Sequence, residues 1–329
     1  MPERLEALKH WLETELSFQE YTLNPASADA SFRRYFRVTH EAGSYIVMDA
    51  PPDREDSRPF VTVSKLLADA GLHVPEVLDA DLGQGFLLLT DLGSQSYLEA
   101  LDADSVERLY GDALGALASI QNCRPAAGVL PDYDRELLLR EMELFREWLL
   151  GTHLGLSLNA AQSALLDGVF ARLADSALAQ PRVCVHRDYH SRNLMVTPRN
   201  NPGILDFQDA VLGPVTYDLV SLLRDCYVQW PRERVEDWAL GYHELALQSG
   251  ILREEHESPQ QFLCWFDLMG VQRHLKAAGI FARLNHRDGK PGYLQDIPRT
   301  LGYVTAVTAG YPELAGFGSF VEQEVLAVL

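Results

Sequence analysis

One short segment of the chain, VCVHRDYHSRNLMV at residues 183–196, carries three side chains of metal-binding type at alternate positions. They are His186, Asp188 and His190. Alternate residues of a strand point to the same side, so a strand could direct all three at one zinc ion. A second interpretation uses Asn193, because Asp188 and Asn193 have the spacing of a catalytic loop for phosphoryl transfer.

A neighbouring acidic segment helps to decide between the two interpretations. GILDFQDA, at residues 203–210, is an apolar strand that ends in Asp206. Phosphoryl transfer needs an Asp that orients and deprotonates the attacking hydroxyl, and an Asn and an Asp that hold Mg²⁺. Asp188, Asn193 and Asp206 are of the types that fill these three roles. A zinc site would leave Asn193 and Asp206 without a purpose, so the sequence favours phosphoryl transfer.

The size and composition of the chain predict two lobes and a small-molecule substrate. Its 329 residues exceed one ordinary domain, and 47% of them are hydrophobic. The formal net charge of −19 disfavours nucleic acid and anionic membranes as partners. The four cysteines form no C-x-x-C pair, and we find neither a signal peptide nor an apolar run of the roughly 20 residues that cross a bilayer. We therefore expect a cytoplasmic protein.

Residue patterns divide the chain into a strand-rich and a helix-rich part. Up to residue 92, alternating apolar residues predict a small mixed sheet, with an amphipathic N-terminal helix and another helix at 58–70. Beyond it, helices are predicted at 105–121, 134–150, 159–179, 216–228, 231–249 and 258–284, and short strands around 183–185, 194–197 and 203–206. We expect an α+β fold with lobes at residues 1–92 and 93–329, joined near the TDLGSQS stretch.

The two motifs, taken together, resemble a known family. VHRDYHSRNLMV followed by ILDFQDA resembles the H-x-D-x-x-x-x-N loop and the metal-binding D-x-x-D segment of the aminoglycoside phosphotransferase and choline kinase superfamily. More narrowly, YIVMDAPP, DFQDAVLGPVTYDLVSLLRD and QRHLKAAGIFARLNHRDGKPGYLQDIPR are similar to the bacterial anomeric kinases of N-acetylmuramate and N-acetylglucosamine. The resemblance spans nearly the whole chain.

The resemblance implies a fold and an activity. The fold is two-lobed and protein-kinase-like, with a nucleotide-binding N-terminal lobe and a mainly helical catalytic and substrate-binding C-terminal lobe. The cofactors are ATP and Mg²⁺, and the substrate is an amino sugar that becomes a sugar 1-phosphate in peptidoglycan recycling. A sugar-1-phosphate nucleotidyltransferase is then the implied pathway partner.

The resemblance also implies roles for individual residues. Asp188 matches the catalytic base, and His186 matches a histidine that braces its loop. Asn193 and Asp206 match the magnesium ligands. The interlobe hinge, whose backbone contacts adenine, matches LLLTDLG, with the contacts at Thr90, Asp91 and Leu92.

The chain departs from this superfamily where nucleotide phosphates bind. Kinases place a lysine on the third strand, but YIVMDA has Met48 at the corresponding position. The turn NPASADAS also lacks a glycine for close backbone approach. We expect Ser31 of this turn and the arginines Arg33 and Arg37 to bind the phosphates instead, with Arg34 on the opposite side of the strand. For each arginine the alternative is an ordinary solvated strand face.

A basic, hydrogen-bonding stripe is predicted on a later helix. Gln272, Lys276, Gly279 and Arg283 recur at helical spacing and therefore share one face. In an acidic chain, such a stripe could bind the N-acetyl and lactyl groups of the sugar. We expect Gln272, Lys276 and Arg283, together with Asp209, to contact the substrate, the alternative being an exposed helix face without a ligand.

Other functions stay open at this point. An aminoglycoside or other small-alcohol kinase would share the chemistry and would have an acidic substrate pocket. A nucleotide-binding pseudokinase would explain Met48, but it has little reason to keep Asp188, Asn193 and Asp206 together. The amino-sugar anomeric kinase accounts for the most features.

Overall fold

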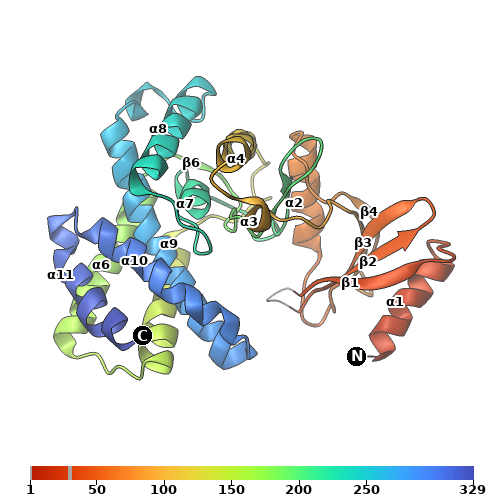
Figure 1. Ribbon diagram of the computed structural model, residues 1–329, viewed down its shortest axis with the longest axis horizontal. Helices are drawn as coiled ribbons and strands as arrows, with labels where there is room; N and C mark the ends of the chain where they lie inside the picture. Colours follow the sequence, from red (N-terminus) through yellow and green to blue (C-terminus); the bar gives the residue numbers. More distant parts are fainter. Residues whose placement is uncertain (1, 29–31) are drawn as a thin grey trace. The chain divides into compact units, whose positions relative to one another are not determined.

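The computed structural model describes residues 2–28 and 32–329, which form two compact units (Figure 1). Unit 1 comprises Met1–Gln95 and Met195–Asp209, and unit 2 comprises Ser96–Leu194 and Ala210–Leu329. The division falls close to the expected joint, but residues 195–209, expected in the second lobe, belong to unit 1. Backbone hydrogen bonds hold them there, from Val196 to Gln95 at 2.8 Å and from Ile204 to His73 at 2.8 Å.

Unit 1 is built on a five-stranded sheet in the order β1-β2-β3-β5-β4. The strands are β1 (Thr22–Ala28), β2 (Arg34–His40), β3 (Gly43–Asp49), β4 (Val77–Asp81) and β5 (Phe86–Thr90). Helix α2 (Arg58–Asp69) returns the chain so that β4 runs parallel to β3, but the hairpin partner β5 lies between them. Every neighbouring pair is therefore antiparallel, and the expectation of a mixed sheet is corrected in this respect.

The first strand differs from the sequence-based expectation. Most of the segment NPASADAS, which we expected to be a turn, lies in β1 and pairs with β2 from Asn24 to Ala28. The register shifts between Pro25 and Ser27. Because β1 is an edge strand, the missing N–H of Pro25 costs no hydrogen bond on its open side.

Helix α1 (Pro2–Thr14) packs on the sheet through its apolar side. The buried cluster comprises Leu8, Trp11, Leu12, Val38, Val47, Phe86 and Leu88. Asp49, at the end of β3, is fully buried and is bound by both Arg4 of α1 and Arg34 of β2. Since a buried carboxylate must be paired, these contacts tie α1 to the sheet and occupy Arg34. Met48 is also fully buried.

Unit 2 is mainly helical. Its helices are α3 (Tyr97–Ala100), α4 (Val106–Gln121), α5 (Arg135–Leu144), α6 (Ala160–Leu178), α7 (Tyr217–Leu223), α8 (Arg232–Gln248), α9 (Pro259–Asp288), α10 (Ile297–Thr308) and α11 (Ala315–Phe320). A π-helical segment, Phe145–His153, continues α5. Strands β6 (Arg182–Val185) and β9 (Val211–Pro214) pair antiparallel, and β7 (Leu194–Met195), at the boundary with unit 1, pairs with β8 (Gly203–Ile204). The predicted helices are confirmed, except that α7 is shorter than expected.

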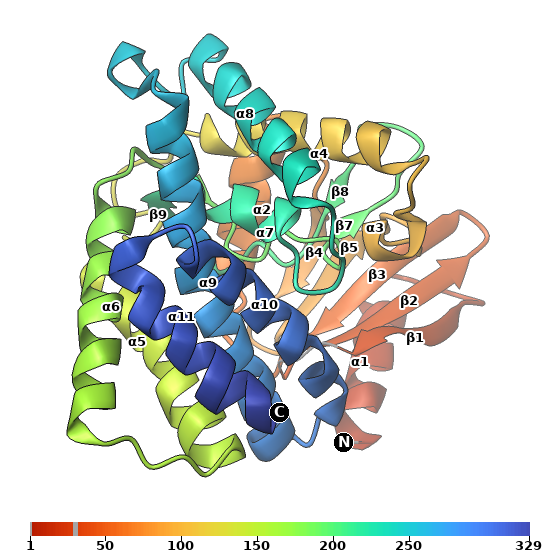
Figure 2. The same ribbon diagram turned by 60° about the vertical axis from the view of Figure 1, so that its left-hand side comes forward.

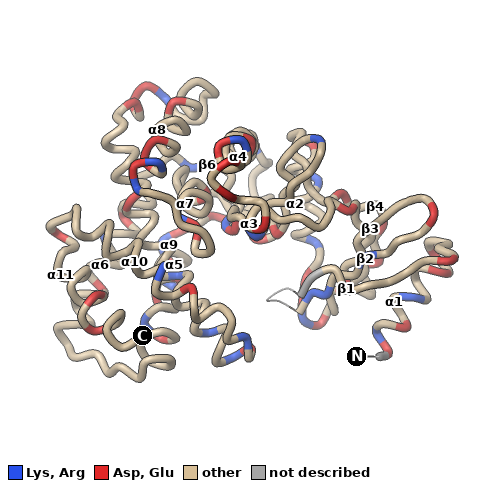
Figure 3. The backbone as a smooth tube through the Cα atoms, in the orientation of Figure 1, with Lys and Arg blue, Asp and Glu red and all other residues tan. Residues whose placement is uncertain are grey.

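Helix α9 is the central element of unit 2 and packs against α5, α6, α7, α8 and α10 (Figure 2). It begins after Ser258, whose side chain accepts the N–H of Gln261, and ends at Gly289 in the left-handed conformation. Within the described residues, no helix has the length and apolar character needed to cross a membrane. Acidic positions are spread over both units, in keeping with the net charge of −19 (Figure 3).

Candidate active site

The loop after β6, which carries Asp188, is anchored through its backbone. The carboxylate of Asp218 in α7 accepts the N–H groups of His186 at 2.6 Å and Arg187 at 2.9 Å. Arg187 has a φ of 78°, a conformation that costs a non-glycine residue about 1–3 kcal/mol. The two hydrogen bonds offset this cost and set the path along which the chain reaches Asp188. Burial raises the pKa of Asp218 to about 7, although both backbone donors favour its ionised form.

Further contacts fix the rest of this loop. Asp225 accepts the N–H groups of Ser191 and Tyr227, both at 2.9 Å. His186 is 1% exposed, and its Nδ1 accepts the N–H of Asp188 at 3.2 Å. His186 is therefore buried and bonded to its own loop, and the bracing role that the resemblance implied stays a prediction.

The side chain of Asn193 is held by the loop that carries Asp188. Its Nδ2 donates to the backbone oxygen of Asp188 at 3.0 Å, so the amide oxygen is turned away from this bond. Oxygen is the atom that Mg²⁺ prefers. The zinc alternative finds no matching geometry, because no group of three or more His, Cys, Asp or Glu side chains among the described residues is arranged to hold a metal.

A buried charged cluster surrounds Asp188. Glu141 of α5 is 4% exposed, accepts hydrogen bonds from Arg187 and Tyr133, and lies 3.2 Å from Nζ of Lys276. Burial raises the pKa of Asp188, but Lys276 and other nearby cations outweigh burial and hold it below its ordinary value. The pKa of Glu141 is lowered for the same reasons, against burial, by Lys276 and Arg187. Asp188 is therefore ionised at neutral pH.

The burial of Gln272 and Lys276 in this cluster argues against the expectation that they contact the substrate. Gln272 is fully buried and donates to Glu141 at 3.3 Å, and Lys276 is only 7% exposed. The helix face turns inward because of Gly279, where a Cβ would come within 2.3 Å of the carbonyl carbon of Leu144. Gln272 therefore contacts Glu141, and the charge of Lys276 acts on Asp188.

The other two residues assigned to the substrate lie elsewhere. Arg283 is half-buried near the end of α9, and Asp209 is exposed and belongs to unit 1. Of the four residues expected to contact the substrate, three therefore belong to unit 2 and Asp209 belongs to unit 1.

Unit 1 contains Asp206 and a cation beside it. Asp206 has a φ of 63°, which is uncommon for a non-glycine residue, and its Oδ1 accepts a hydrogen bond from Gln208 at 2.7 Å. Nη1 of Arg33 lies 4.0 Å from Oδ1 of Asp206, and Nη2 of Arg33 lies 3.2 Å from Oε2 of Glu55. Burial lowers the pKa of Arg33, but Tyr35 and the nearby carboxylates outweigh it and raise the pKa. A guanidinium thus stands next to the expected metal ligand.

Arg37 has a different position. It donates to both oxygens of Asp91, at 2.6 and 3.0 Å, and to the carbonyl of Gly93 at 2.8 Å. Ser44 donates to the same carboxylate at 2.5 Å. Burial raises the pKa of Asp91, but these donors outweigh burial and lower it. Arg37 therefore braces the end of β5, which corrects its assignment to the phosphates, and Ser31 lies outside the described residues.

The expected hinge is only partly available for adenine. The N–H of Thr90 already donates to the carbonyl of Glu76 at 3.1 Å, and Thr90 Oγ1 accepts the N–H of Glu76 at 3.0 Å. The side chain of Leu92 is buried against the position of Gly203. Any backbone donor to adenine must therefore come from beyond Thr90, which corrects that part of the expectation.

These arrangements predict different results for two matched variants. We expect Arg33→Ala to raise the KM for ATP about tenfold or more, because a charge-assisted contact to phosphate is worth at least about 1.4 kcal/mol. Arg37→Ala removes a guanidinium from the half-buried carboxylate of Asp91 in the same unit, so we expect it to lower the melting temperature with a smaller change in KM. Steady-state kinetics and thermal melts measure both, and equal effects on KM would contradict the distinction.

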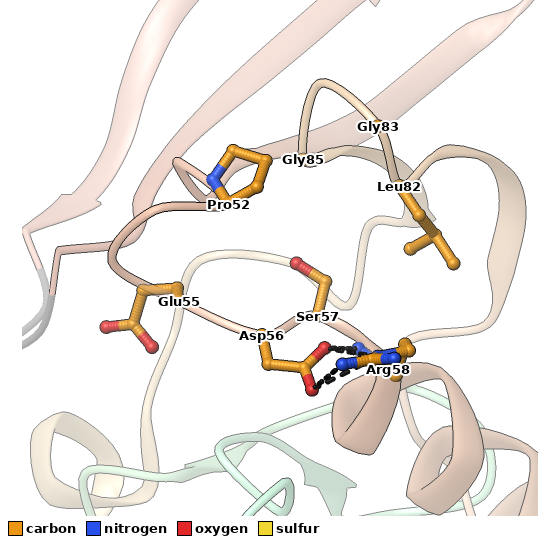
Figure 4. A pocket seen from close by; sticks show the side chains of 8 residues that line it. All are labelled: Pro52, Glu55, Asp56, Ser57, Arg58, Leu82, Gly83 and Gly85. Carbon is orange, nitrogen blue, oxygen red and sulfur yellow. Dashed lines mark hydrogen bonds and ion pairs between the residues drawn. The ribbon is translucent and has the colours of Figure 1, made fainter.

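A separate hollow of about 360 Å³ lies in unit 1, between the loop before α2 and the β4–β5 turn (Figure 4). Glu55 and Asp56 are among its lining residues, and Asp56 is paired with Arg58 at 2.9 Å. Gly85 also lines it, in a positive-φ conformation where a Cβ would lie 1.9 Å from the carbonyl oxygen of Ala50. None of the residues that we assigned to catalysis or binding lines this hollow.

Comparisons with known proteins agree on one family. A model of the phosphotransferase enzyme family matches residues 22–258. A Pseudomonas putida protein named N-acetylmuramate/N-acetylglucosamine kinase is 50% identical over 337 residues, which cover 98% of both chains. A Pseudomonas aeruginosa protein of the same name is 52% identical over 299 residues, which cover 91% of this chain and 87% of that protein.

A solved structure supports the fold. The choline kinase of Streptococcus pneumoniae has a TM-score of 0.62 with this chain at 13% identity, and the match covers 92% of this chain and 99% of that one. At this identity the likeness concerns the fold alone, and it confirms the kinase-like α+β fold.

Proposed function

The chain belongs to the phosphotransferase enzyme family and is a sugar kinase, and on that premise we propose that it phosphorylates the anomeric hydroxyl of N-acetylmuramate or N-acetylglucosamine. The phosphoryl donor is ATP. The product is a sugar 1-phosphate, which a nucleotidyltransferase of the peptidoglycan recycling route would consume.

The observation that carries this proposal is the state of Asp188. Its loop is held by Asp218 and Asp225, and its pKa lies below the ordinary value, although burial alone would raise it, because Lys276 and other cations are near. Such a carboxylate is a weak base. An anomeric hydroxyl is more acidic than an ordinary sugar alcohol, so a weak base is sufficient to accept its proton. The main contribution of Asp188 is then to orient this hydroxyl.

The proposed step balances as a simple transfer. The anomeric oxygen forms a bond to the γ-phosphorus of ATP, and the bond from that phosphorus to the bridging oxygen breaks, which leaves ADP. The proton of the attacking hydroxyl passes to Asp188. Arg33 is the cation that we assign to the phosphates, because it stands beside Asp206.

Asn193 and Asp206 are the residues that would hold Mg²⁺. The amide oxygen of Asn193 and the carboxylate of Asp206 are hard oxygen ligands, and few protein ligands suffice for Mg²⁺ because phosphates and water complete its coordination. When bound, the ion neutralises charge that develops on the phosphates.

The test is the position of the new phosphate. We expect N-acetylglucosamine or N-acetylmuramate to yield the 1-phosphate, the methyl glycoside to remain unphosphorylated, and the 6-deoxy sugar to be a substrate. Phosphorus NMR of the product, with its coupling to the anomeric proton, identifies the site. Transfer to the 6-hydroxyl, or turnover of the methyl glycoside, would refute the anomeric assignment, and preferred turnover of an aminoglycoside would refute the amino-sugar assignment.

A further inference from the structure

Arg192 lies on the catalytic loop, next to Asn193, with its guanidinium against two tyrosine rings. Its Cζ is 3.9 Å from the ring centroid of Tyr227 and 5.2 Å from that of Tyr293. The residue is exposed. Over the described ranges 2–28 and 32–329, Arg192 forms no hydrogen bond or ion pair with another side chain. Its charge is held in place by the rings and is not neutralised.

The rings beneath Arg192 form a fixed support, which we call the tyrosine platform: Tyr227, Phe281 and Tyr293. Phe281 of α9 stacks on Tyr293 at 5.7 Å between centroids and lies 6.1 Å from Tyr227. The backbone N–H of Tyr227 is held by Asp225 at 2.9 Å. A cation–π contact at an exposed site is worth about 0.5–1 kcal/mol, so the platform orients the guanidinium at little cost.

Two acidic side chains near Arg192 accept hydrogen bonds from other groups. Asp225 accepts the backbone N–H groups of Ser191 and Tyr227. Burial raises the pKa of Asp296, against the charges of Arg299 and Arg192; its Oδ1 pairs with Arg299 at 3.1 Å, and its Oδ2 has no hydrogen-bond partner among the described residues. Arg192 therefore keeps a local positive charge in a chain whose net charge is −19.

Arg192 also shares its surroundings with Asp188. Both residues lie close enough to His190 to act on its charge, together with Asp225 and Arg273. Lys276, by contrast, is occupied by Glu141 at 3.2 Å. Burial and the charge of Arg287 lower the pKa of Arg283, which is half-buried. Unlike Lys276 and Arg283, Arg192 combines an exposed guanidinium with a place on the loop that carries Asp188.

We propose that Arg192 is a specificity-determining residue that binds the carboxylate of N-acetylmuramate. This inference rests on the proposed function. The two sugars differ in one substituent, a lactyl ether at O3 that carries a carboxylate in N-acetylmuramate and is absent from N-acetylglucosamine. A guanidinium binds a carboxylate through two parallel hydrogen bonds, and the tyrosine platform presents this group already oriented. The helix stripe that we expected to bind this substituent is buried at Gln272 and Lys276, whereas Arg192 is exposed.

The test compares the two sugars on Arg192→Gln. The ratio of kcat/KM for N-acetylmuramate to that for N-acetylglucosamine should fall about tenfold or more, mainly through the KM for N-acetylmuramate, and Arg192→Lys should restore part of it. Arg108→Gln, which removes an exposed arginine of α4, serves as the control and should leave the ratio unchanged. An unchanged ratio in Arg192→Gln would overturn the proposal.

A second measurement uses only the parent enzyme, so its result does not depend on whether the variant folds correctly. The methyl ester of N-acetylmuramate lacks the negative charge, so the parent enzyme should use it with about the reduced kcat/KM that Arg192→Gln shows for the acid. If the parent uses ester and acid equally well, Arg192 does not bind the carboxylate. If the parent phosphorylates neither free sugar, the proposed function itself fails, and this inference falls with it.

Discussion

Asp188→Asn should lower kcat by on the order of 10²-fold or more while ATP binding is retained. The two side chains have nearly the same shape, so the loop held by Asp218 and Asp225 should keep its path. The amide cannot accept the hydroxyl proton, and it carries no charge to orient the attacking group between Lys276 and the other nearby cations. Single-turnover kinetics with saturating ATP and sugar measure the chemical step.

A matched variant separates this effect from general loss of a carboxylate. Asp175→Asn removes an exposed carboxylate of α6 that pairs with Arg135, a surface contact worth about 0–1 kcal/mol. We expect it to turn over at the rate of the parent. Turnover of Asp188→Asn within a few-fold of the parent would exclude Asp188 as the proton acceptor.

Local sequence patterns were sufficient for most helices, whereas the catalytic roles assigned to the loop stay predictions. The types and spacing of Asp188 and Asn193 are set by chemistry that acts within one loop, and helical periodicity is equally local. The resemblance drawn from these motifs is confirmed by the family model and the relatives. The sheet order was not predictable in the same way, because which strand lies between β3 and β4 depends on pairing across α2 and a hairpin.

The groups that hold the catalytic loop could not be found from sequence. Asp218 binds the N–H of His186 from 32 positions away, and Glu141 binds Arg187 from 46 positions away. Asp218 lies within a segment that supports the family resemblance, but a carboxylate in the first turn of a helix gives no sign of the loop it will anchor. Glu141 sits among ordinary helix residues and gives none at all.

Periodicity also failed to distinguish a buried face from a binding face. Gln272 and Lys276 do share a side of α9, as expected, but the side faces α5 because Gly279 lets the two backbones meet. One small residue, Gly279, decides whether this face of α9 is buried, and its effect depends on the helix that packs against it. Arg192, an exposed basic residue, lies in the loop motif itself, and periodicity could not single it out because a lone arginine carries no periodic signal.

Three arginines at and near the start of β2 are close in sequence but pair with different carboxylates. Alternation placed Arg33 and Arg37 together and Arg34 apart. In the structure each has a carboxylate of its own: Asp49 for Arg34, Asp91 for Arg37, and Glu55 for Arg33. Only Arg33 also lies beside Asp206, because the segment that follows β8 belongs to unit 1. Strand alternation reports the side on which a residue lies, and not its partner.

Asp206→Ala should abolish the contribution of Mg²⁺ to ATP binding, with a loss on the order of 10²-fold in affinity when magnesium is present. The variant deletes a charged ligand for which water is a poor substitute. In the presence of a chelator, the variant should bind ATP no more weakly than the parent, because the removed carboxylate would repel phosphates that Arg33 attracts. Calorimetric titrations with and without Mg²⁺ measure this difference directly.

Two further variants make the result specific. Alanine in the left-handed conformation of Asp206 adds backbone strain, whereas asparagine tolerates that conformation, so Asp206→Asn should show the same loss of magnesium dependence with less loss of stability. Asp53→Ala removes an exposed carboxylate of the same unit and should leave magnesium dependence intact. If Asp206→Asn gains as much affinity from Mg²⁺ as the parent does, Asp206 is not a ligand of the ion, and the role of Arg33 beside it must be assigned without a metal.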